Sequence, residues 1–276
     1  MKIVKRSGFV VDFDRSRLRR SLLKSGASTH DAEKVLQSIS AQIYDGMPTK
    51  KIYRLAFEHL KKLPGSTAAR YNLRTAIKQL GPAGFFFEKY IAEVLMSEGY
   101  KTRTNLILTG KCVTHEIDIV LRKNDVITMA ECKFHMRSES RSDVKVPMYI
   151  LSRFNDLKGQ PQQIFAPQDL ITECLIVTNN RFTADAITFA DCSGLQLLSW
   201  DYPKTASLAK KIDENGLYPV TCLTTLTSSE KQKLLILNVL LARELLTGPD
   251  TLEQIGLSPG RIRNVGRETA ELCNLK

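Results

Sequence analysis

The sequence predicts an α+β and α/β multidomain protein. We expect an N-terminal β-hairpin plus four helices, then an α/β core with a central mixed sheet, and a small helical C-terminal extension. Two observations indicate this organisation: helical and β-branched runs alternate through the middle of the chain, and Gly81-Pro82-Ala83-Gly84 interrupts the pattern before them. The predicted domain limits are 1–80, 83–205 and 224–276.

The first domain opens with "KIVKRSGFVVDF", which is typical of two strands joined by a Ser-Gly turn. Asp14 follows at the position of a helix N-cap, ahead of "RSRLRRSLLKSG". Helical spacing then recurs in "THDAEKVLQSISAQIYDG", in "TKKIYRLAFEHLKKL" with Thr49 as its cap, and in "STAARYNLRTAIKQL".

The core is predicted from its alternating segments. A helix at "FFFEKYIAEVLMSEGY" precedes strands at "KTRTNLIL", "EIDIVLR" and "VITMAECKF". A helix at "VPMYILSRFNDLK", a strand at "ECLIVTNN", a helix at "TADAITFADCS" and a strand at "LQLLSW" follow. Beyond the core, "SSEKQKLLILNVLLARELL" predicts one amphipathic helix, and "TLEQIGLSPGRIRNVGRETAELC" predicts two short helices around a Ser-Pro-Gly turn.

The positive charge is concentrated in the first domain. Residues 1–80 hold 17 Lys and Arg against 6 Asp and Glu, whereas the other 196 residues hold 23 of each, so the whole net charge of +11 belongs to the N-terminal segment. Such asymmetry favours an anionic partner there, either nucleotide phosphates or nucleic acid. A basic surface that serves only solubility is the alternative.

The sequence contains no apolar run as long as a membrane span and no signal-peptide pattern at its start, so we expect no membrane partner and a cytoplasmic location. Its six cysteines form no Cys-x-x-Cys pair, which argues against a zinc ribbon. We expect all six to be reduced and structural.

Charged residues in two strands that should be buried carry the chemical signal. Asp118 lies in one strand, and Glu131 and Lys133, two residues apart, lie on one face of the next. Two carboxylates can hold Mg²⁺, which activates water for attack on a phosphodiester, and a nearby lysine can orient that water. A salt bridge at the strand ends is the alternative.

This pattern resembles the PD-(D/E)xK nuclease superfamily, with Asp118 as its Asp and "ECK" supplying Glu131 and Lys133. "GFFFEKYIAEVLMSEGY" is similar to the opening helix of Mrr-like restriction endonucleases, and "CLIVTNNRFTADAITFA" to their later strand and helix. The resemblance implies a restriction-endonuclease-like fold, catalytic roles for Asp118, Glu131, Lys133 and Glu88, and metal ligation by Asp118 and Glu131. It also leaves open a domain that has kept the fold and lost catalysis.

The residue before the Asp is Ile117, preceded by His115-Glu116, where many relatives have Gly or Pro. His115 could approach the site, although a single histidine beside a strand is more often structural.

The first domain resembles the ATP-cone, through "VKRSGFVVDFDRSRLRRSLLKS", "YDGMPTKKIY" and "AARYNLR". This module precedes ribonucleotide reductases and occurs in their transcriptional repressors. The resemblance implies that Lys5 and Arg6 grip the phosphates of ATP or dATP, with Asp14, Arg17, Thr49 and Tyr53 completing the pocket. Ser7 and Val11 depart from the family pattern and leave the choice of nucleotide open.

The C-terminal "GLSPGRIRNVGRETA" weakly resembles a helix-hairpin-helix, in which Arg261, Arg263 and Arg267 would contact a DNA phosphate. A helical cap on the sheet or a dimer contact explains this segment equally well.

Together these features predict a nucleotide-regulated, Mg²⁺-dependent DNA endonuclease whose N-terminal cone senses ATP or dATP and forms a homo-oligomer. A non-catalytic, nucleotide-responsive DNA-binding regulator is the alternative from another class. A cone that contacts nucleic acid directly is a third hypothesis.

Overall fold

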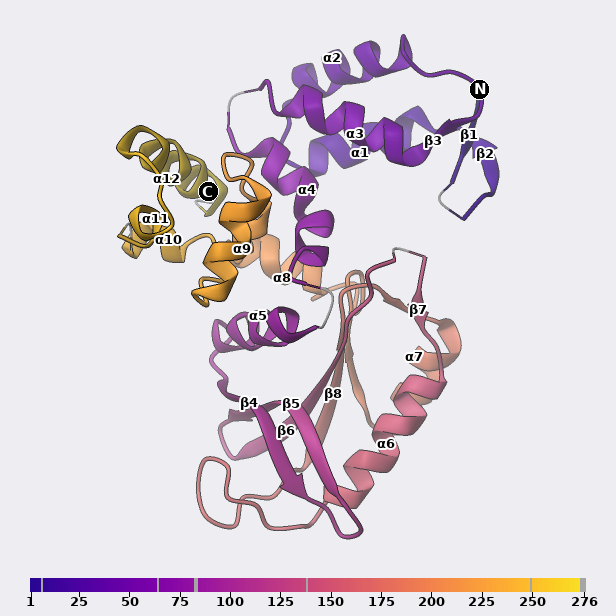
Figure 1. Ribbon diagram of the computed structural model, residues 1–276. Helices are drawn as coiled ribbons and strands as arrows, with labels where there is room; N and C mark the ends of the chain where they lie inside the picture. Colours follow the sequence, from indigo (N-terminus) through magenta and orange to yellow (C-terminus); the bar gives the residue numbers. More distant parts are fainter. Residues whose placement is uncertain (6, 64, 82–83, 138, 249, 274–276) are drawn as a thin grey trace. The chain divides into compact units, whose positions relative to one another are not determined.

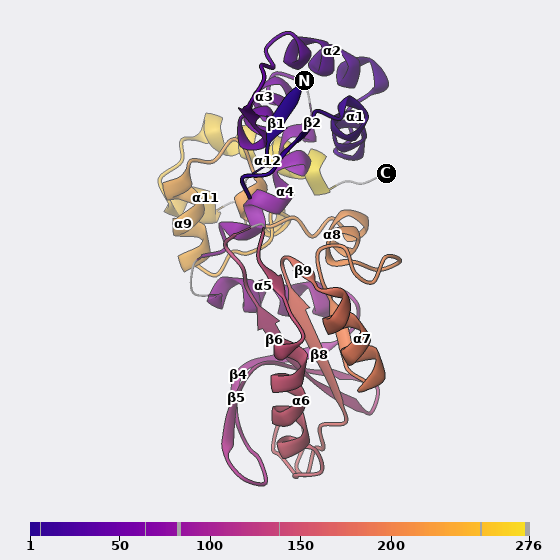
Figure 2. The same cartoon turned by 90° about the vertical axis from the view of Figure 1, so that its right-hand side faces the viewer.

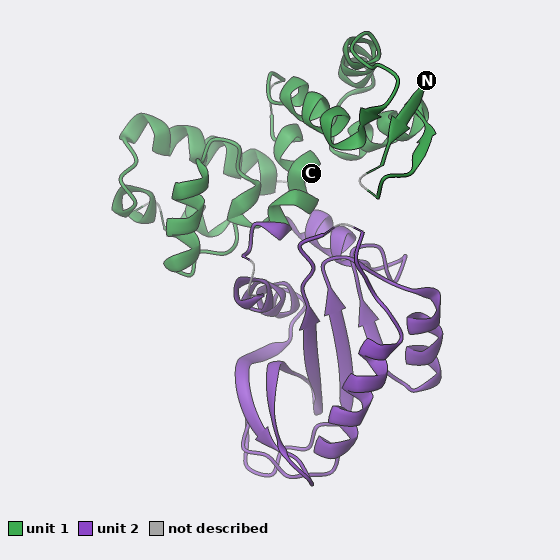
Figure 3. Cartoon of the chain, turned by 45° about the vertical axis from the view of Figure 1, so that its right-hand side comes forward, with its two compact units in different colours: residues 1–77, 218–276 green, residues 78–217 purple. Residues whose placement is uncertain are grey.

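The computed structural model describes residues 1–5, 7–63, 65–81, 84–137, 139–248 and 250–273. Its internal contacts divide the chain into two compact units (Figure 3). Unit 1 contains Met1–Ile77 and Tyr218–Lys276, and unit 2 contains Lys78–Leu217. The cone and the C-terminal helices therefore belong to one unit, and the predicted nuclease core belongs to the other.

The N-terminal part of unit 1 is a small sheet beside four helices (Figure 1). The sheet has the order β2-β1-β3, with β1 antiparallel to β2 and parallel to β3. Its elements are β1 (Lys2–Val4), β2 (Val10–Asp12), α1 (Arg15–Lys24), α2 (Thr29–Ser40), β3 (Met47–Pro48), α3 (Thr49–Leu60) and α4 (Thr67–Lys78). The predicted hairpin and four helices are confirmed, while the two-residue strand β3 was not predicted.

Local chemistry sets the ends of these helices. Asp14 caps α1, since its Oδ1 accepts a hydrogen bond from Arg17 N at 2.9 Å. The predicted Thr49 cap is wrong by one position: Pro48 is the N-cap of α3 and Thr49 is its first helical residue. Leu22, Leu36, Ile39, Ala56 and Leu60 are fully buried and form the core of this part.

The C-terminal part of unit 1 is helical throughout. It contains η1 (Val220–Cys222), α9 (Ser228–Ile236), α10 (Glu244–Thr247), α11 (Asp250–Gln254) and α12 (Pro259–Cys273). The two last helices were expected around the Ser-Pro-Gly turn, and the structure places Pro259 and Gly260 in the first turn of α12.

The single helix predicted over 228–246 is wrong, because α9 ends at Ile236 and Asn238 adopts the left-handed conformation at φ +59°. The residues after Asn238 pair with an extended segment instead of continuing the helix. Val220 N donates to Leu240 O at 2.9 Å, and Ala242 N donates to Tyr218 O at 2.8 Å. These tertiary hydrogen bonds replace the helical ones that the apolar periodicity favours.

Helix α4 joins the two parts of unit 1. Thr221 Oγ1 donates to Ala76 O at 2.8 Å, and Ser66 Oγ and Arg70 Nη2 donate to Glu271 O at 3.2 and 3.3 Å. The C-terminal segment is thus fastened along the length of a cone helix.

Unit 2 is built on a five-stranded mixed sheet with the order β10-β8-β6-β5-β4. Strands β4 (Lys101–Thr109), β5 (Thr114–Lys123) and β6 (Val126–Lys133) are antiparallel neighbours, whereas β6, β8 (Glu173–Thr178) and β10 (Gln196–Leu198) run parallel. The predicted α/β core with a central mixed sheet is confirmed.

Helices cover both faces of this sheet (Figures 1 and 2). Helices α6 (Lys145–Leu157) and α7 (Ala184–Cys192) lie against one face, where Ile150, Phe154 and Ala186 are buried. Helix α5 (Phe85–Met96) packs against β4 and β5. The remaining elements are β7 (Arg141–Ser142), β9 (Arg181–Phe182) and α8 (Leu208–Asn215).

All six cysteine thiols are free, as expected, although Cys112 and Cys192 are exposed and do not belong to the core. Among the described residues, no helix has both the length and the apolar character needed to cross a membrane.

The carboxylate of Glu268 in unit 1 accepts several hydrogen bonds, which leads to a prediction about stability. It is buried and accepts hydrogen bonds of 2.6–2.9 Å from the backbone N–H and hydroxyl groups of Thr224 and Thr225. Glu268→Ala leaves those donors unpaired and should lower the free energy of unfolding by about 2–3 kcal/mol. Glu271→Ala, an exposed position on the same helix, is the control for thermal unfolding. Equal melting temperatures for the two variants would contradict this account.

Candidate active site

Asp118 lies where the sheet divides. The β5–β6 ladder ends at the pair Ile119 and Ala130, and the next pair would be Asp118 and Glu131. In its place, Cys132 N donates to Asp118 Oδ2 at 2.7 Å, while β6 continues its parallel pairing with β8 as far as Lys133. The side chain of Asp118 therefore takes the hydrogen bond that the neighbouring strand would otherwise provide.

The other neighbour of β5 is also irregular at this level. Thr104 and Leu106 of β4 pair with Ile119 and Ile117, and Asn105 between them, opposite Asp118, has φ +54°. Strand pairing is thus interrupted on both sides of Asp118, as is common where a sheet opens to form a site.

Two cations hold Glu131, which is 5% exposed. Lys133 Nζ donates to its Oε1 at 2.9 Å, and Arg153 Nη1 of α6 lies 2.7 Å from its Oε2. The Arg153 contact is an ion pair without hydrogen-bond geometry, so Oε2 is a buried acceptor with no hydrogen-bond donor.

A polar cavity of about 310 Å³ gives access to these carboxylates. Asp118 and Glu131 line it together with Thr114, His115, Glu116, Tyr149 and Arg153. Lys133 and Glu88 are beside this group of carboxylates but are not part of the lining. The structure therefore brings Asp118, Glu131 and Lys133 together, with Glu88 close enough to feel their charges.

Burial and mutual repulsion raise the pKa of the acids. Burial, and then the charge of Glu131, raise the pKa of Asp118 to about 6, against the hydrogen bond from Cys132 N. Burial raises the pKa of Glu88 to about 7, with further contributions from the charges of Asp118, Glu131 and Glu116. Burial thus contributes most to both shifts, and repulsion between the neighbouring carboxylates adds to it.

Glu88 lies in the first turn of α5, beside Gly84. Gly84 is the N-cap residue at φ +81°, and a side chain there would place its Cβ 3.2 Å from Glu88 Oε1. A glycine is required at this position because of both the backbone conformation and the close carboxylate.

His115 is bonded to Asp156. Its Nε2 lies 2.7 Å from Asp156 Oδ2, and Asp156 also accepts hydrogen bonds from Cys112 N and Val113 N. The bond to His115 holds the pKa of Asp156 down at about 2, so the carboxylate is ionised and Nε2 carries the proton. The structure therefore uses His115 to tie the β4–β5 turn to α6.

The donor set fits Mg²⁺. No group of three or more His, Cys, Asp or Glu side chains able to hold a metal occurs within the described ranges. However, Mg²⁺ is commonly bound by one or two carboxylates with water and phosphate oxygens filling the other positions. Glu131 Oε2, which lacks a hydrogen-bond donor, and the partly buried Asp118 supply two hard oxygen ligands in an acidic cavity.

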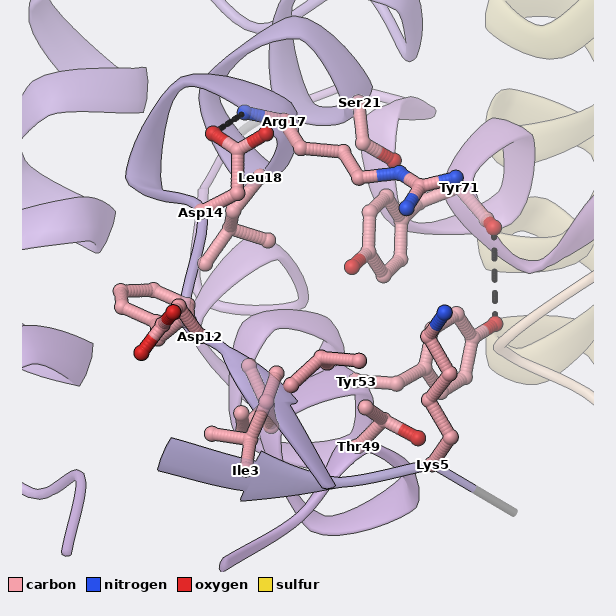
Figure 4. A pocket seen from close by; sticks show the side chains of 13 residues that line it. Ile3, Lys5, Asp12, Asp14, Arg17, Leu18, Ser21, Thr49, Tyr53 and Tyr71 are labelled. Carbon is pink, nitrogen blue, oxygen red and sulfur yellow. Dashed lines mark hydrogen bonds between the residues drawn. The ribbon is translucent and has the colours of Figure 1, made fainter. Parts of the chain in front are cut away.

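The second cavity lies in the cone and measures about 280 Å³. Lys5, Asp14, Arg17, Thr49 and Tyr53 line it, and Arg6 lies outside the described residues. In Figure 4 the cationic ends of Lys5 and Arg17 lie on the side of Tyr53 and Tyr71, with Asp12 and Asp14 on the other side. The cavity thus offers two cations and apolar walls to one ligand.

Tyr71 was not predicted, and with Tyr53 it forms the aromatic wall. Their rings stack with centroids 4.9 Å apart, and Tyr53 Oη donates to Asn72 Oδ1 at 3.0 Å. Burial raises the pKa of both phenols, so both are neutral in the physiological range. Tyr71 lies on α4 within "AARYNLR", a segment that carries the resemblance to the ATP-cone. That membership was the signal in the sequence that could have identified it.

In the C-terminal part of unit 1, the side chain of Arg261 is bonded to other residues of the same chain. Its guanidinium pairs with Glu230 and donates to Thr225 O at 2.8 Å. This pair holds the pKa of Glu230 down at about 2.

The fold and the two cavities define a class of protein: an ATP-cone joined to a restriction-endonuclease-like domain. Residues 1–79 match the ATP cone domain, residues 82–204 match the restriction endonuclease family, and residues 218–273 match the AF1548-like C-terminal family. Both resemblances found in the sequence are confirmed, and residues 82–204 are a nuclease-type domain.

The chain belongs to the AF1548-like family. An uncharacterized protein of Archaeoglobus fulgidus is 31% identical over 183 residues, which are 66% of this chain and 99% of the relative. The crystal structure of a protein of unknown function, AF1548, is 30% identical and has a TM-score of 0.56, covering 68% of this chain and 97% of that one.

The MspJI restriction endonuclease in complex with a 27-mer oligonucleotide is 13% identical, with a TM-score of 0.32. The match covers 49% of this chain and 30% of that one.

The raised pKa values predict how stability depends on pH without metal. Asp118 and Glu88 titrate near 6 and 7 in the folded chain, against 3.8 and 4.5 ordinarily, so between these values the folded state binds more protons than the unfolded state. The free energy of unfolding should therefore fall as pH rises from about 4 to 7. In the double variant Asp118→Asn, Glu88→Gln, this part of the fall should disappear from melting curves recorded in EDTA. Identical pH slopes for the two proteins would refute the assignment.

Proposed function

We propose that this protein is a nucleotide-regulated, Mg²⁺-dependent endodeoxyribonuclease. The observation that carries the proposal is the meeting of Asp118 and Glu131 in one polar cavity, with Lys133 bonded to Glu131 at 2.9 Å. In this proposal the domains are the ATP-cone at 1–80, the nuclease at 83–205 and a helical extension at 224–276.

Asp118 and Glu131 would hold the metal. When bound, Mg²⁺ supplies an activated water and stabilises charge on the phosphate and the leaving oxygen. Asp118 keeps its orientation through the hydrogen bond from Cys132 N, so one carboxylate oxygen is fixed and the other is available to a ligand.

Lys133 would orient the attacking water, and Glu88 would accept or return a proton. Lys133 is half-buried and fixed by Glu131, so it can orient the attacking water on the side of Glu131 Oε1. Glu88 has a pKa of about 7, which suits a group that accepts or returns a proton at neutral pH.

The cone would bind ATP or dATP in the 280 Å³ cavity. Lys5 and Arg17 would contact the phosphates, as would Arg6, which lies outside the described residues, while Asp14, Thr49 and Tyr53 would bound the nucleoside. Regulation requires that the nucleotide bind two states of the protein with different affinities, for example two oligomeric states formed through the cone. DNA is the proposed substrate, and the cytoplasm the proposed location.

The first experiment is cleavage of supercoiled plasmid with Mg²⁺, with and without ATP and dATP. Lys133→Ala should reduce the rate by about 10²-fold or more, because it removes a group that orients the water. Lys101→Ala, at the exposed start of β4, is the matched control and should cut like the wild type.

The outcome also decides between an endonuclease and a non-catalytic DNA-binding regulator. Cutting that depends on Lys133 and responds to nucleotide supports both parts of the proposal. If the wild type leaves plain, methylated and single-stranded DNA intact in Mg²⁺ and in Mn²⁺, the enzyme is excluded. The nucleotide-responsive DNA-binding regulator then becomes the better account.

Nucleotide binding is tested separately by calorimetry with ATP and dATP. Lys5→Ala and Arg17→Ala should each weaken binding by about tenfold or more, because each removes a charge-assisted contact to phosphate. Arg20→Ala, an exposed arginine on the same helix as Arg17, should bind like the wild type. A third hypothesis, a cone that contacts nucleic acid, predicts DNA binding that weakens steeply with salt and is indifferent to ATP.

A further inference from the structure

We propose that Arg153 is a further catalytic residue, whose guanidinium contacts the phosphate diester in the active-site cavity. This inference rests on the proposed nuclease function. The pattern that identified the site extends only from Glu88 to Lys133, and Arg153 lies on the helix that follows it.

Arg153 is held in the cavity by two rigid elements. Its side chain is 11% exposed and lines the cavity with Asp118 and Glu131. Its Nη2 donates to the carbonyl oxygen of Glu116 on β5. Helix α6 is fixed in turn by Phe154 in the core and by the hydrogen bond between Asp156 and His115. The guanidinium is thus preorganised, as a group that contacts a reacting phosphate must be.

The guanidinium keeps N–H donors for a ligand. Its one hydrogen bond runs from Nη2 to Glu116 O, and its contact with Glu131 Oε2 lacks hydrogen-bond geometry. Arginine presents a planar fork of donors that matches two oxygens of a phosphate. A phosphate entering the cavity therefore meets the guanidinium N–H groups that lie outside the bond to Glu116 O and the 2.7 Å ion pair with Glu131.

The acidic lining of the cavity favours a cationic contact to the phosphate. Glu116, Asp118 and Glu131 all line it, and the substrate adds the negative charge of the phosphate. Lys133 lies outside the lining of the cavity, whereas the side chain of Arg153 is part of it. The centroid of the Tyr149 ring, a residue that is 60% exposed, lies 5.7 Å from the Arg153 guanidinium carbon, and both side chains line the cavity.

The two cations also approach different oxygens of Glu131. Lys133 of β6 is bonded to Oε1, and Arg153 of α6 is paired with Oε2. This separation supports two roles, with Lys133 orienting the water and Arg153 stabilising charge on a non-bridging oxygen of the phosphate.

A purely structural role for Arg153, the neutralisation of Glu131, makes different predictions. It would require Arg153 for metal binding through Glu131 and would involve no phosphate oxygen. A test must therefore measure metal affinity and oxygen-specific effects as well as rate.

The experiment compares wild type, Arg153→Gln and the control Arg181→Gln on a duplex with a phosphorothioate at the cut linkage, as separate Rp and Sp diastereomers. Arg181 pairs with Asp201 on the surface of the same unit. Arg153→Gln should slow single-turnover cleavage by about 10²–10³-fold and reduce the difference between the diastereomers, while Mn²⁺ affinity stays within about threefold. Arg181→Gln should match the wild type.

Three results would overturn the inference: a wild-type rate in Arg153→Gln, an unchanged diastereomer preference, or loss of Mn²⁺ binding, which would indicate the structural role. If the wild type cuts no substrate, the nuclease proposal fails on its own. Arg153 is then judged by DNA affinity in Ca²⁺, where about tenfold weaker binding by Arg153→Gln than by Arg181→Gln supports the phosphate contact and equal binding rejects it.

Discussion

The hydrogen bond from Cys132 N to Asp118 Oδ2 is the interaction on which the candidate active site depends. It ends the pairing of β5 with β6 and lets β6 continue beside β8. A regular ladder would have left Asp118 and Glu131 as a cross-strand pair of like charges, which is destabilising. Because the strands separate, the same two carboxylates line a cavity instead, with one strand fixed against the other by a side chain.

The cost of this arrangement is visible in the electrostatics. Burial and repulsion raise the pKa of Asp118 and Glu88, while Lys133 and Arg153 are both drawn to Glu131. Local destabilisation of this kind is characteristic of functional sites, where the surrounding fold maintains charges that would otherwise disperse. Rigid elements on three sides, β5, β6 and α6, provide that support here.

The sequence predicts what is local and misses what packing decides. The strands of the core follow from β-branched runs, and the shared face of Glu131 and Lys133 follows from strand alternation. Arg153 could not be assigned, because its partner lies on a strand 22 residues earlier and only the packing of α6 on the sheet joins them. The helix expected through Asn238 fails for a related reason: an extended segment near Tyr218 offers hydrogen bonds that outweigh apolar periodicity.

Helix α4 and the C-terminal helices also govern how the chain can assemble. Unit 1 is discontinuous in sequence, because residues 78–217 separate its two parts. Thr221 of the second part donates a hydrogen bond to Ala76 O of the first. Closing a loop of that length in a disordered chain carries an entropic cost that grows with the logarithm of its length. A ribosome also releases residues 78–217 before Thr221 is available, so unit 2 can fold while unit 1 still lacks its last helices. Unit 2 can therefore acquire its structure before unit 1 is complete, and a chain cut short after Leu217 would contain all of unit 2 and only the N-terminal part of unit 1.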